Sequence, residues 1–168
     1  MKGLVYKSTG SWYSVKTEGG NIYDCKIKGK LRLKNINSTN PVVVGDIVEF
    51  IVEEHDLQKI GIIQKIHDRR NYILRKSVNL SKQTHILASN IDLLLLVVTA
   101  KNPITTTSFI DRFLVSAEAY SIKTILVFNK CDIYDEDDYI LLNSMINIYD
   151  NIGYETLKTS TLSGLGIK

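Results

Sequence analysis

The sequence predicts two modules in one chain, a small β-barrel or β-sandwich followed by an α/β domain. In roughly the first 70 residues, short runs of alternating apolar and polar residues are separated by turns, which is typical of half-buried strands. Later, continuous apolar runs alternate with segments of helical spacing, as in an α/β sheet. The charge divides similarly, because residues 1–82 hold 15 Lys/Arg against 8 Asp/Glu, whereas residues 83–168 hold 6 against 10. The basic first module is therefore the better candidate for binding nucleic acid.

The composition of the 168 residues, 44% apolar and 23% charged, is that of a globular protein and excludes a disordered or fibrous chain. The longest apolar run, 93–98, is too short to cross a membrane, and the first residues lack the apolar core of a secretion signal. Cys25 and Cys131 lie far apart without CxxC spacing, and the histidines are scattered, which excludes a disulfide framework and a zinc motif. These features indicate the reducing cytoplasm.

A β-hairpin is predicted over residues 11–28, where two alternating runs flank a Gly-rich turn. From Tyr23 to Lys34 the alternation continues, so that apolar side chains lie on one face of the strand and basic ones on the other. Two further runs, 42–52 and 60–66, predict additional strands, and so many short strands suggest a barrel or sandwich. We call the basic residues of the first run the basic ladder: Lys26, Lys28, Lys30, Arg32 and Lys34.

The basic ladder allows two interpretations. Its side chains could follow a phosphate backbone while the neighbouring Trp12 and Tyr13 stack on bases. Alternatively, the ladder is an ordinary solvated strand face, on which lysine also discourages edge-to-edge aggregation. Five like charges within nine residues repel one another, which favours an anionic partner. Arg69 and Arg70 would extend this candidate RNA-binding surface if they fold nearby.

The second module is predicted to alternate strands and helices. Residues 91–98 are nearly all apolar, as expected of a strand that is buried on both faces of a parallel sheet. Residues 124–128 form a second buried strand, and residues 155–159 are a candidate third. Helical spacing follows residue 108, and the acidic segment 135–138 suits a helix N-terminus, where the helix dipole favours negative charge. This order of elements predicts an α/β domain.

An NKxD motif, Asn129-Lys130-Cys131-Asp132, follows the second of these strands directly, where α/β sheets bind ligands. A carboxylate at Asp132 can accept the two adjacent donors of guanine, N1–H and the 2-amino group, which adenine lacks. Asn129 can bond the base or tie neighbouring loops together, and the aliphatic stem of Lys130 can lie along the ring. The alternative interpretation is a polar loop that caps the next helix.

The loop after the third predicted strand, residues 159–166, is the second candidate for base recognition. Ser160 and its small neighbours could bring backbone N–H groups to the guanine O6 atom, or they form a flexible turn. A phosphate-binding GxxxxGK[ST] loop is absent from the 168 residues, because the Gly-Lys pair at 29–30 lacks the following Ser or Thr, and Asp24 replaces the first glycine. In ordinary GTPases the phosphate loop lies N-terminal to the NKxD motif. Here the base-recognition segments precede any phosphate-binding ones, which indicates a permuted order.

This combination resembles the circularly permuted family of ribosome-small-subunit-dependent GTPase A (RsgA/YjeQ), and the resemblance runs through nearly the whole chain. It implies an OB-fold barrel over residues 1–70, a linker over 71–89, and over 90–168 the first part of a circularly permuted P-loop GTPase domain. The segments that carry it are Lys28-Gly29-Lys30-Leu31-Arg32, Val44-Gly45-Asp46-Ile47-Val48, Arg69-Arg70-Asn71 with Leu74-Arg75, Asn90-Ile91-Asp92, Ile110-Asp111-Arg112-Phe113-Leu114, Asn129 to Asp132 and Ser160 to Gly166.

The resemblance also implies a function, the late maturation of the small ribosomal subunit by a GTPase that this subunit stimulates. The barrel would bind ribosomal RNA, and the α/β domain would bind GTP or GDP through Asn129, Lys130, Asp132 and Ser160. The phosphate loop, the Mg²⁺ ligands and a Zn²⁺ site belong to the C-terminal part of the family's proteins. This chain is therefore expected to be an N-terminal fragment without catalytic residues, unable to hydrolyse GTP alone.

Two other functions stay open. The chain could be a non-enzymatic RNA-binding module in which the α/β half is a scaffold. A protein-interaction domain would explain neither the basic ladder nor the NKxD motif. No membrane partner is expected. A sheet that ends after its third strand leaves an edge and apolar surface uncovered, so the chain is expected to self-associate, or its second half to be partly mobile.

Overall fold

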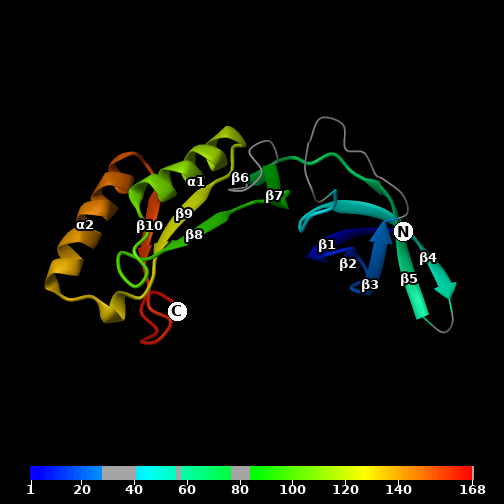
Figure 1. The fold of residues 1–168 in the computed structure, drawn as a ribbon, viewed down its shortest axis with the longest axis horizontal. Coiled ribbons are helices and arrows are strands. Elements are labelled where there is room, and N and C mark those ends of the chain that lie inside the picture. Colours follow the sequence, from blue (N-terminus) through cyan, green and yellow to red (C-terminus); the bar gives the residue numbers. More distant parts are fainter. Residues whose placement is uncertain (28–40, 56–57, 77–83, 168) are drawn as a thin grey trace. The chain divides into compact units, whose positions relative to one another are not determined.

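The structure, a computed structural model, describes residues 1–27, 41–55, 58–76 and 84–167 (Figure 1). The chain divides into two compact units, Met1–Ile91 and Asp92–Lys168. Of the described elements, strands β1 to β7 lie in the first unit, and strands β8 to β10 lie in the second with helices α1 and α2.

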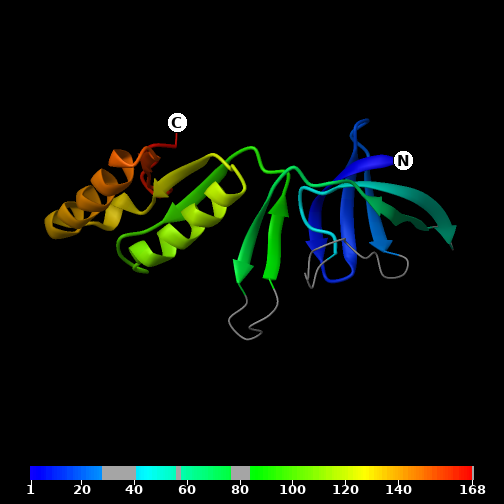
Figure 2. The ribbon, with the colours of Figure 1, turned by 90° about the horizontal axis from the view of Figure 1, so that it is seen from above.

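A closed five-stranded barrel makes up most of the first unit (Figures 1 and 2). Its order is β1-β2-β3-β5-β4, and its pairs are antiparallel except for β3 with β5. The predicted barrel and hairpin are confirmed, whereas β1 was missing from the prediction because a bulge between Val5 and Lys7 interrupts its alternation. The strands are β1 (Lys2–Thr9), β2 (Trp12–Thr17), β3 (Ile22–Ile27), β4 (Ile47–His55) and β5 (Gln58–Ile66).

Alternate residues of these strands fill the barrel and leave their neighbours outside. Tyr13 is 3% exposed and packs in the core, whereas the preceding residue, Trp12, is 42% exposed. The prediction that both aromatic rings stack on bases is therefore wrong for Tyr13, because neighbouring residues of a strand point to opposite faces. The buried core of the barrel consists of Val5, Tyr13, Val15, Cys25, Val42, Val48, Phe50 and Ile63.

A tight turn delays the strand that was predicted to start at Val42, so that β4 begins only at Ile47. Gly45 in this turn has a φ of +92°, and a Cβ atom at this position would lie 1.9 Å from the carbonyl oxygen of Ser89. Glycine suits both the backbone conformation and the close approach, since it has no side chain. The turn thus brings Val44 to Ser89, whose N–H donates to the Val44 carbonyl at 2.9 Å.

The segment 71–89, which was expected to be a linker, holds a β-hairpin of β6 (Tyr72–Lys76) and β7 (Thr84–Ser89). The hairpin is attached to the turn before β4. Val44 forms a bridge with Ala88, and the side-chain amide of Asn90 donates to the Gly45 carbonyl at 2.8 Å. The hairpin therefore belongs to the same compact unit as the barrel.

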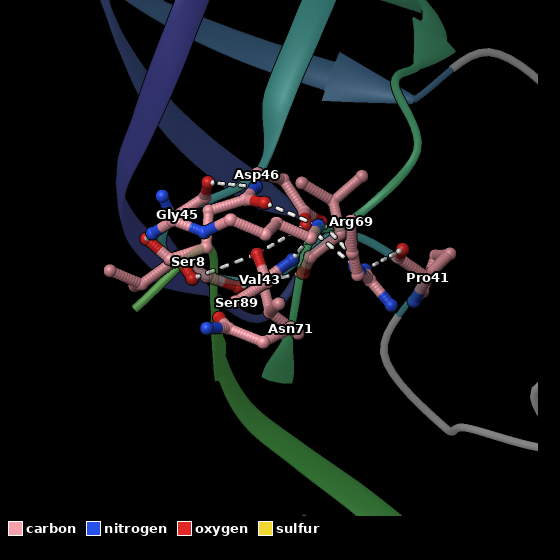
Figure 3. A network of polar contacts seen from close by, with 12 residues as sticks. Ser8, Pro41, Val43, Gly45, Asp46, Arg69, Asn71 and Ser89 are labelled. Atoms are coloured by element: carbon pink, nitrogen blue, oxygen red, sulfur yellow. Dashed lines mark hydrogen bonds and ion pairs between the residues drawn. The ribbon is translucent and has the colours of Figure 1, made fainter. Parts of the chain in front are cut away.

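A buried ion pair lies where the hairpin and the barrel meet (Figure 3). The carboxylate of Asp46 is fully buried and accepts two bonds from the guanidinium of Arg69, from Nε at 2.6 Å and from Nη2 at 2.7 Å. The same carboxylate accepts from the Val43 N–H at 2.9 Å and from the Ser89 hydroxyl at 2.6 Å. Such a two-pronged pair, completed by further donors, compensates the cost of burying both charges.

Arg69 was expected to contact RNA, and the structure does not support that expectation. Its side chain is 5% exposed, and its Nη2 atom also donates to the Pro41 carbonyl at 3.1 Å. Two of its guanidinium nitrogens are thus engaged within the protein, and the third, Nη1, is buried without a hydrogen-bond partner among the described residues. Arg70 is exposed, although its N–H and its Nη2 atom both bond to Asn90.

The second unit is a three-stranded parallel sheet, ordered β10-β9-β8, with two helices. Helix α2 begins with a capping box at Asp135, as its acidic start predicted. The described elements confirm the predicted α/β order. Their bounds are β8 (Leu94–Val98), α1 (Thr107–Ala119), β9 (Thr124–Phe128), the short 3-10 helix η1 (Cys131–Ile133), α2 (Glu136–Asn151) and β10 (Glu155–Lys158).

Both helices pack on one face of this sheet. Leu96 and Leu126 lie side by side on that face and share a buried core with residues of α1 and α2. On the other face, Leu95 is 54% exposed, Val97 58% and Leu157 41%. The prediction that the first strand is buried on both faces is therefore wrong for β8, because within the described residues only one layer of helices covers the sheet.

Asp46→Ala is expected to lower the free energy of unfolding of the first unit by about 3–5 kcal/mol, because it leaves the Arg69 guanidinium buried without its partner. Urea unfolding followed by the fluorescence of Trp12, the single tryptophan, measures this. Glu49→Ala is the matched control. Glu49 pairs with Lys65 and His67 at the surface and should cost less than about 1 kcal/mol. Equal losses in the two variants would contradict the role of Asp46.

Candidate functional site

The candidate site lies at the carboxyl ends of the strands of the second unit. The loop 129–132 leaves β9 between two neighbours that hold its backbone. The Asn129 N–H donates to the Val98 carbonyl at 2.8 Å, and the Cys131 N–H donates to the Thr159 carbonyl at 3.1 Å. The NKxD motif is thus fixed to the ends of both adjoining strands, where ligands bind in α/β sheets.

The structure brings Asp132 and Ser160 together from separate loops. The hydroxyl of Ser160 donates a short hydrogen bond to Oδ1 of Asp132 and itself accepts from the Ser163 N–H at 3.0 Å. Ser160 is fully buried, whereas Asp132 is exposed. The buried hydroxyl therefore holds one oxygen of a carboxylate that belongs to an exposed residue. The Ser160 N–H donates to the Leu165 carbonyl at 2.9 Å, so a backbone donor for guanine O6 has to come from another residue of this loop.

Asn129 and Lys130 are both held by the surrounding loops. The side-chain oxygen of Asn129 accepts from the Thr159 hydroxyl at 3.1 Å, which is the loop-tying role that was one of its two predicted possibilities. Lys130 has a φ of +64°, a left-handed conformation that lysine rarely adopts and that is concentrated at functional sites. Its ammonium group donates to the Asn102 carbonyl at 2.6 Å, so the exposed side chain reaches toward the loop after β8.

Tyr134 supports this site and was not predicted. Its hydroxyl donates to the Asn129 carbonyl and accepts from the Ala100 N–H, both at 2.8 Å, and so joins the NKxD loop to the end of β8. Burial raises the pKa of Tyr134, so the hydroxyl keeps its proton at neutral pH and can donate. Cys131, the variable residue of the motif, is also buried, and burial raises the pKa of its thiol. No short motif marks these supporting residues.

A cluster of charges borders the site. Lys101 bonds to Asp138 at 2.7 Å and to Asp135 at 3.3 Å, and thereby ties the loop after β8 to the start of α2. These hydrogen bonds raise the pKa of the Lys101 ammonium group. The Asp138 N–H, and then Lys101, hold the pKa of Asp135 below its usual value. The ends of β8 and β9 and the start of α2 thus form one connected frame.

The predicted RNA-binding surface is described only in part. The ammonium group of Lys26 lies 4.0 Å from the centroid of the Trp12 ring, on the outside of the barrel. Arg70 is exposed, and Arg69 is buried as described above. The other four members of the basic ladder lie outside the described residues: Lys28, Lys30, Arg32 and Lys34.

Within the described residues, no group of three or more His, Cys, Asp or Glu side chains is arranged to hold a metal ion. None of the helices in the described part of the chain is long and apolar enough to cross a membrane.

Solved structures with this fold define a class of protein. The chain is similar to the crystal structure of YjeQ from Thermotoga maritima, with a TM-score of 0.69 and 35% identity over 99% of this chain and 54% of that one. It is also similar to the crystal structure of YloQ, a circularly permuted GTPase, with a TM-score of 0.61 and 30% identity over 95% of this chain and 51% of that one. A closed barrel followed by part of a circularly permuted GTPase domain is therefore the fold of this chain.

Two family models divide the chain between them. The model of the RsgA N-terminal domain matches residues 2–63, and that of the RsgA GTPase matches residues 66–168. The chain belongs to the RsgA GTPase family.

Curated relatives agree with this assignment. The Flavobacterium psychrophilum protein named small ribosomal subunit biogenesis GTPase RsgA is 55% identical to this chain, and the match covers 100% of this chain and 52% of the relative. The Bacteroides fragilis protein of the same name is also 55% identical, and the match covers 99% of this chain and 53% of the relative. The chain thus spans about half the length of the curated relatives it matches.

Tyr134→Phe is expected to lower the free energy of unfolding of the second unit by about 1–3 kcal/mol, because it leaves the Ala100 N–H and the Asn129 carbonyl without their partner. Thermal unfolding followed by the circular dichroism of the helices measures the loss. Tyr6→Phe, at an exposed ring of β1, is the control and should stay within about 0.5 kcal/mol of the parent. A Tyr134→Phe variant as stable as this control would remove Tyr134 from the support of the site.

Proposed function

We propose that this chain contributes the guanine-recognition site and an RNA-binding barrel to a GTPase that assists late maturation of the small ribosomal subunit. The observation that carries the proposal is the exposed carboxylate of Asp132, which Ser160 orients at the carboxyl edge of the sheet. The family and the names of the curated relatives support it. The buried cysteines suit a cytoplasmic location.

Each residue of the site has a role in this proposal. Asp132 accepts N1–H and the 2-amino group of guanine, and its carboxylate would be left unpaired by adenine. Ser160 acts as a positioning residue, since its hydroxyl holds one oxygen of that carboxylate. Lys130 lays its aliphatic stem along the base, anchored at the Asn102 carbonyl, and Asn129 holds the loop that carries it.

The phosphates of GTP, with Mg²⁺, need residues that the 168-residue sequence lacks, because it has no GxxxxGK[ST] loop. In this proposal they are bound, and GTP is hydrolysed, by the half of the relatives' length that this chain does not span. The same half would carry a Zn²⁺ site. This chain alone therefore binds guanine nucleotides weakly and does not hydrolyse them.

The barrel supplies the contact with ribosomal RNA. The basic ladder begins at Lys26, beside the exposed Trp12, and lysines and aromatic rings together are the usual surface for a nucleic-acid strand. Within the described residues, this pairing supports the GTPase proposal and a second candidate function equally well. The second candidate is an RNA-binding module whose α/β half is only a scaffold. Nucleotide binding decides between the two.

The uncovered face of the second unit favours self-association of this chain. Leu95, Val97 and Leu157 are exposed on that face, and neighbouring apolar side chains of this size are normally covered.

Asp132→Asn is expected to exchange guanine for xanthine specificity. An amide cannot accept both guanine donors, but its NH₂ group can donate to the 2-oxo group of xanthine. Calorimetry with GDP, xanthosine diphosphate and ATP tests this on the chain and on a fusion in which the remaining half of the Flavobacterium psychrophilum relative follows Lys168.

The fusion should bind GDP at least about tenfold more tightly than ATP, which corresponds to about 1.4 kcal/mol. Asp132→Asn should reverse the preference between GDP and xanthosine diphosphate. Asp137→Asn, an exposed carboxylate of α2, is the control and should change neither affinity. Equal affinities for GDP and ATP in the fusion would reject the GTPase proposal and leave the RNA-binding module.

Replacing Lys28, Lys30 and Arg32 by Gln is expected to weaken RNA binding and its dependence on salt. Each lost phosphate contact lowers the slope of log affinity against log salt by about 0.7 for a single strand, so three lost contacts lower it by about 2. Fluorescence anisotropy of an end-labelled single-stranded RNA measures both quantities. The control replaces three exposed basic residues of the second unit, Arg112, Lys123 and Lys158. If both triple variants have the same slope, the basic ladder does not contact phosphates.

A further inference from the structure

A shallow depression on the outer face of the barrel has a volume of about 300 Å³. The strand register assembles it from two neighbouring rows of side chains. Lys7 pairs with Ser14, and Ser14 with Asp24, which forms a polar row across β1, β2 and β3. The adjacent row pairs Thr9 with Trp12. All five side chains line the depression, so one wall is aromatic and the other polar.

Trp12 is the aromatic wall, and its exposure is unusual for its size. The residue is 42% exposed on a barrel whose interior is filled by smaller side chains. The ammonium group of Lys26 lies over the ring, 4.0 Å from its centroid, and Trp12 lines the depression together with Lys7, Thr9, Ser14 and Asp24. An exposed aromatic ring beside cations suits stacking on a nucleic-acid base.

Asp24 gives the depression a chemistry that a phosphate site would not have. Oδ1 of its carboxylate accepts from the Ser14 hydroxyl at 3.0 Å, which orients the group at the surface. A carboxylate repels phosphate but accepts the N–H groups on the edge of a base, as Asp and Glu do when they recognise amino groups of bases. Lys7, which lines the depression, and Lys26, which lies over the Trp12 ring, supply the positive charge for flanking phosphates.

We propose that this depression binds a single unstacked guanine base of an RNA strand. The base stacks on Trp12, and its N1–H and 2-amino group donate to Asp24, since guanine alone among the RNA bases offers two adjacent donors to one carboxylate. Lys7 and Lys26 contact the neighbouring phosphates. The inference rests on the proposed RNA-binding role of the barrel, and its site is separate from the NKxD site, because it lies in the first unit and takes a base within a strand.

The single tryptophan of the chain reports on this site directly. The intact chain is titrated with three RNA hexamers, hexauridylate and two variants in which one central uridine is replaced by guanosine or by inosine, which lacks the 2-amino group. The guanosine hexamer is expected to quench Trp12 emission and to bind at least about tenfold more tightly than hexauridylate. Inosine should fall between them, because it retains one of the two donors.

Variants test the two walls separately, with affinities taken from the anisotropy of labelled RNA. Asp24→Asn should reduce the preference for guanosine over uridine to within about twofold, while Glu18→Gln, an exposed carboxylate in the turn after β2, should leave it unchanged. Trp12→Ala should weaken binding of the guanosine hexamer about tenfold or more, and Trp12→Phe less. Both Trp12 variants replace an exposed ring, and circular dichroism checks that they fold.

Two outcomes overturn the base site. One is RNA binding without quenching of Trp12. The other is quenching that is equal for the guanosine and uridine hexamers and unaffected by Asp24→Asn. If the replacement of Lys28, Lys30 and Arg32 still weakens RNA binding and its salt dependence in that case, the barrel remains an RNA-binding surface. Failure of all three hexamers to bind overturns the base site together with the RNA-binding role. Asp137→Asn, at an exposed carboxylate of α2 outside both proposed base sites, should give the parent's quenching curve.

Discussion

The first unit depends on the compensation of one buried carboxylate. Asp46 has no exposed surface, and its charge is tolerated only because Arg69, Ser89 and the Val43 N–H all donate to it. These donors come from the turn before β4, the segment after β5 and the end of β7. These hydrogen bonds offset the free-energy cost of burying the charge. The loss of any donor would leave the carboxylate in the low-dielectric interior with less compensation. The interaction therefore fixes the place of the turn, of the hairpin and of Gly45, which lies against Ser89.

The second unit is organised by a different constraint, the meeting of strand ends at one edge of a parallel sheet. Ser160 lies 28 residues after Asp132 in sequence, but the two become neighbours because β9 and β10 run in the same direction and end together. Polar groups outside the proposed contacts with the base, such as the Tyr134 hydroxyl and the Thr159 hydroxyl, hold the loops in place. A site that recognises a base by a single carboxylate needs this support, since a misoriented carboxylate would accept from only one donor.

Alternation and apolar runs predicted most strands, and a four-residue motif predicted the candidate site, because these features act over neighbouring residues. The features that were missed depend on distant partners. Arg69 was taken for a surface cation since the pattern around it shows nothing of Asp46, 23 residues earlier. The β6–β7 hairpin was taken for a linker because that boundary came with the family resemblance and not from the pattern of its own residues. The strand β8 was expected to be covered on both faces because an apolar run does not show how many layers surround it. Tyr134 acts through the backbone groups of Ala100 and Asn129, which leave no signature in sequence.

The dependence of Asp46 on distant donors also bears on where this chain can be divided. The two family models meet between residues 63 and 66, at the end of the barrel's last strand. A barrel excised at that border would keep Asp46 but lose Arg69 and Ser89, and so would bury a lone negative charge. The boundary between the two family models is therefore not a position at which the chain can be cut without destabilising the barrel. A piece that retains every donor to this carboxylate has to extend through the hairpin to Ser89, close to Ile91, where the first compact unit ends.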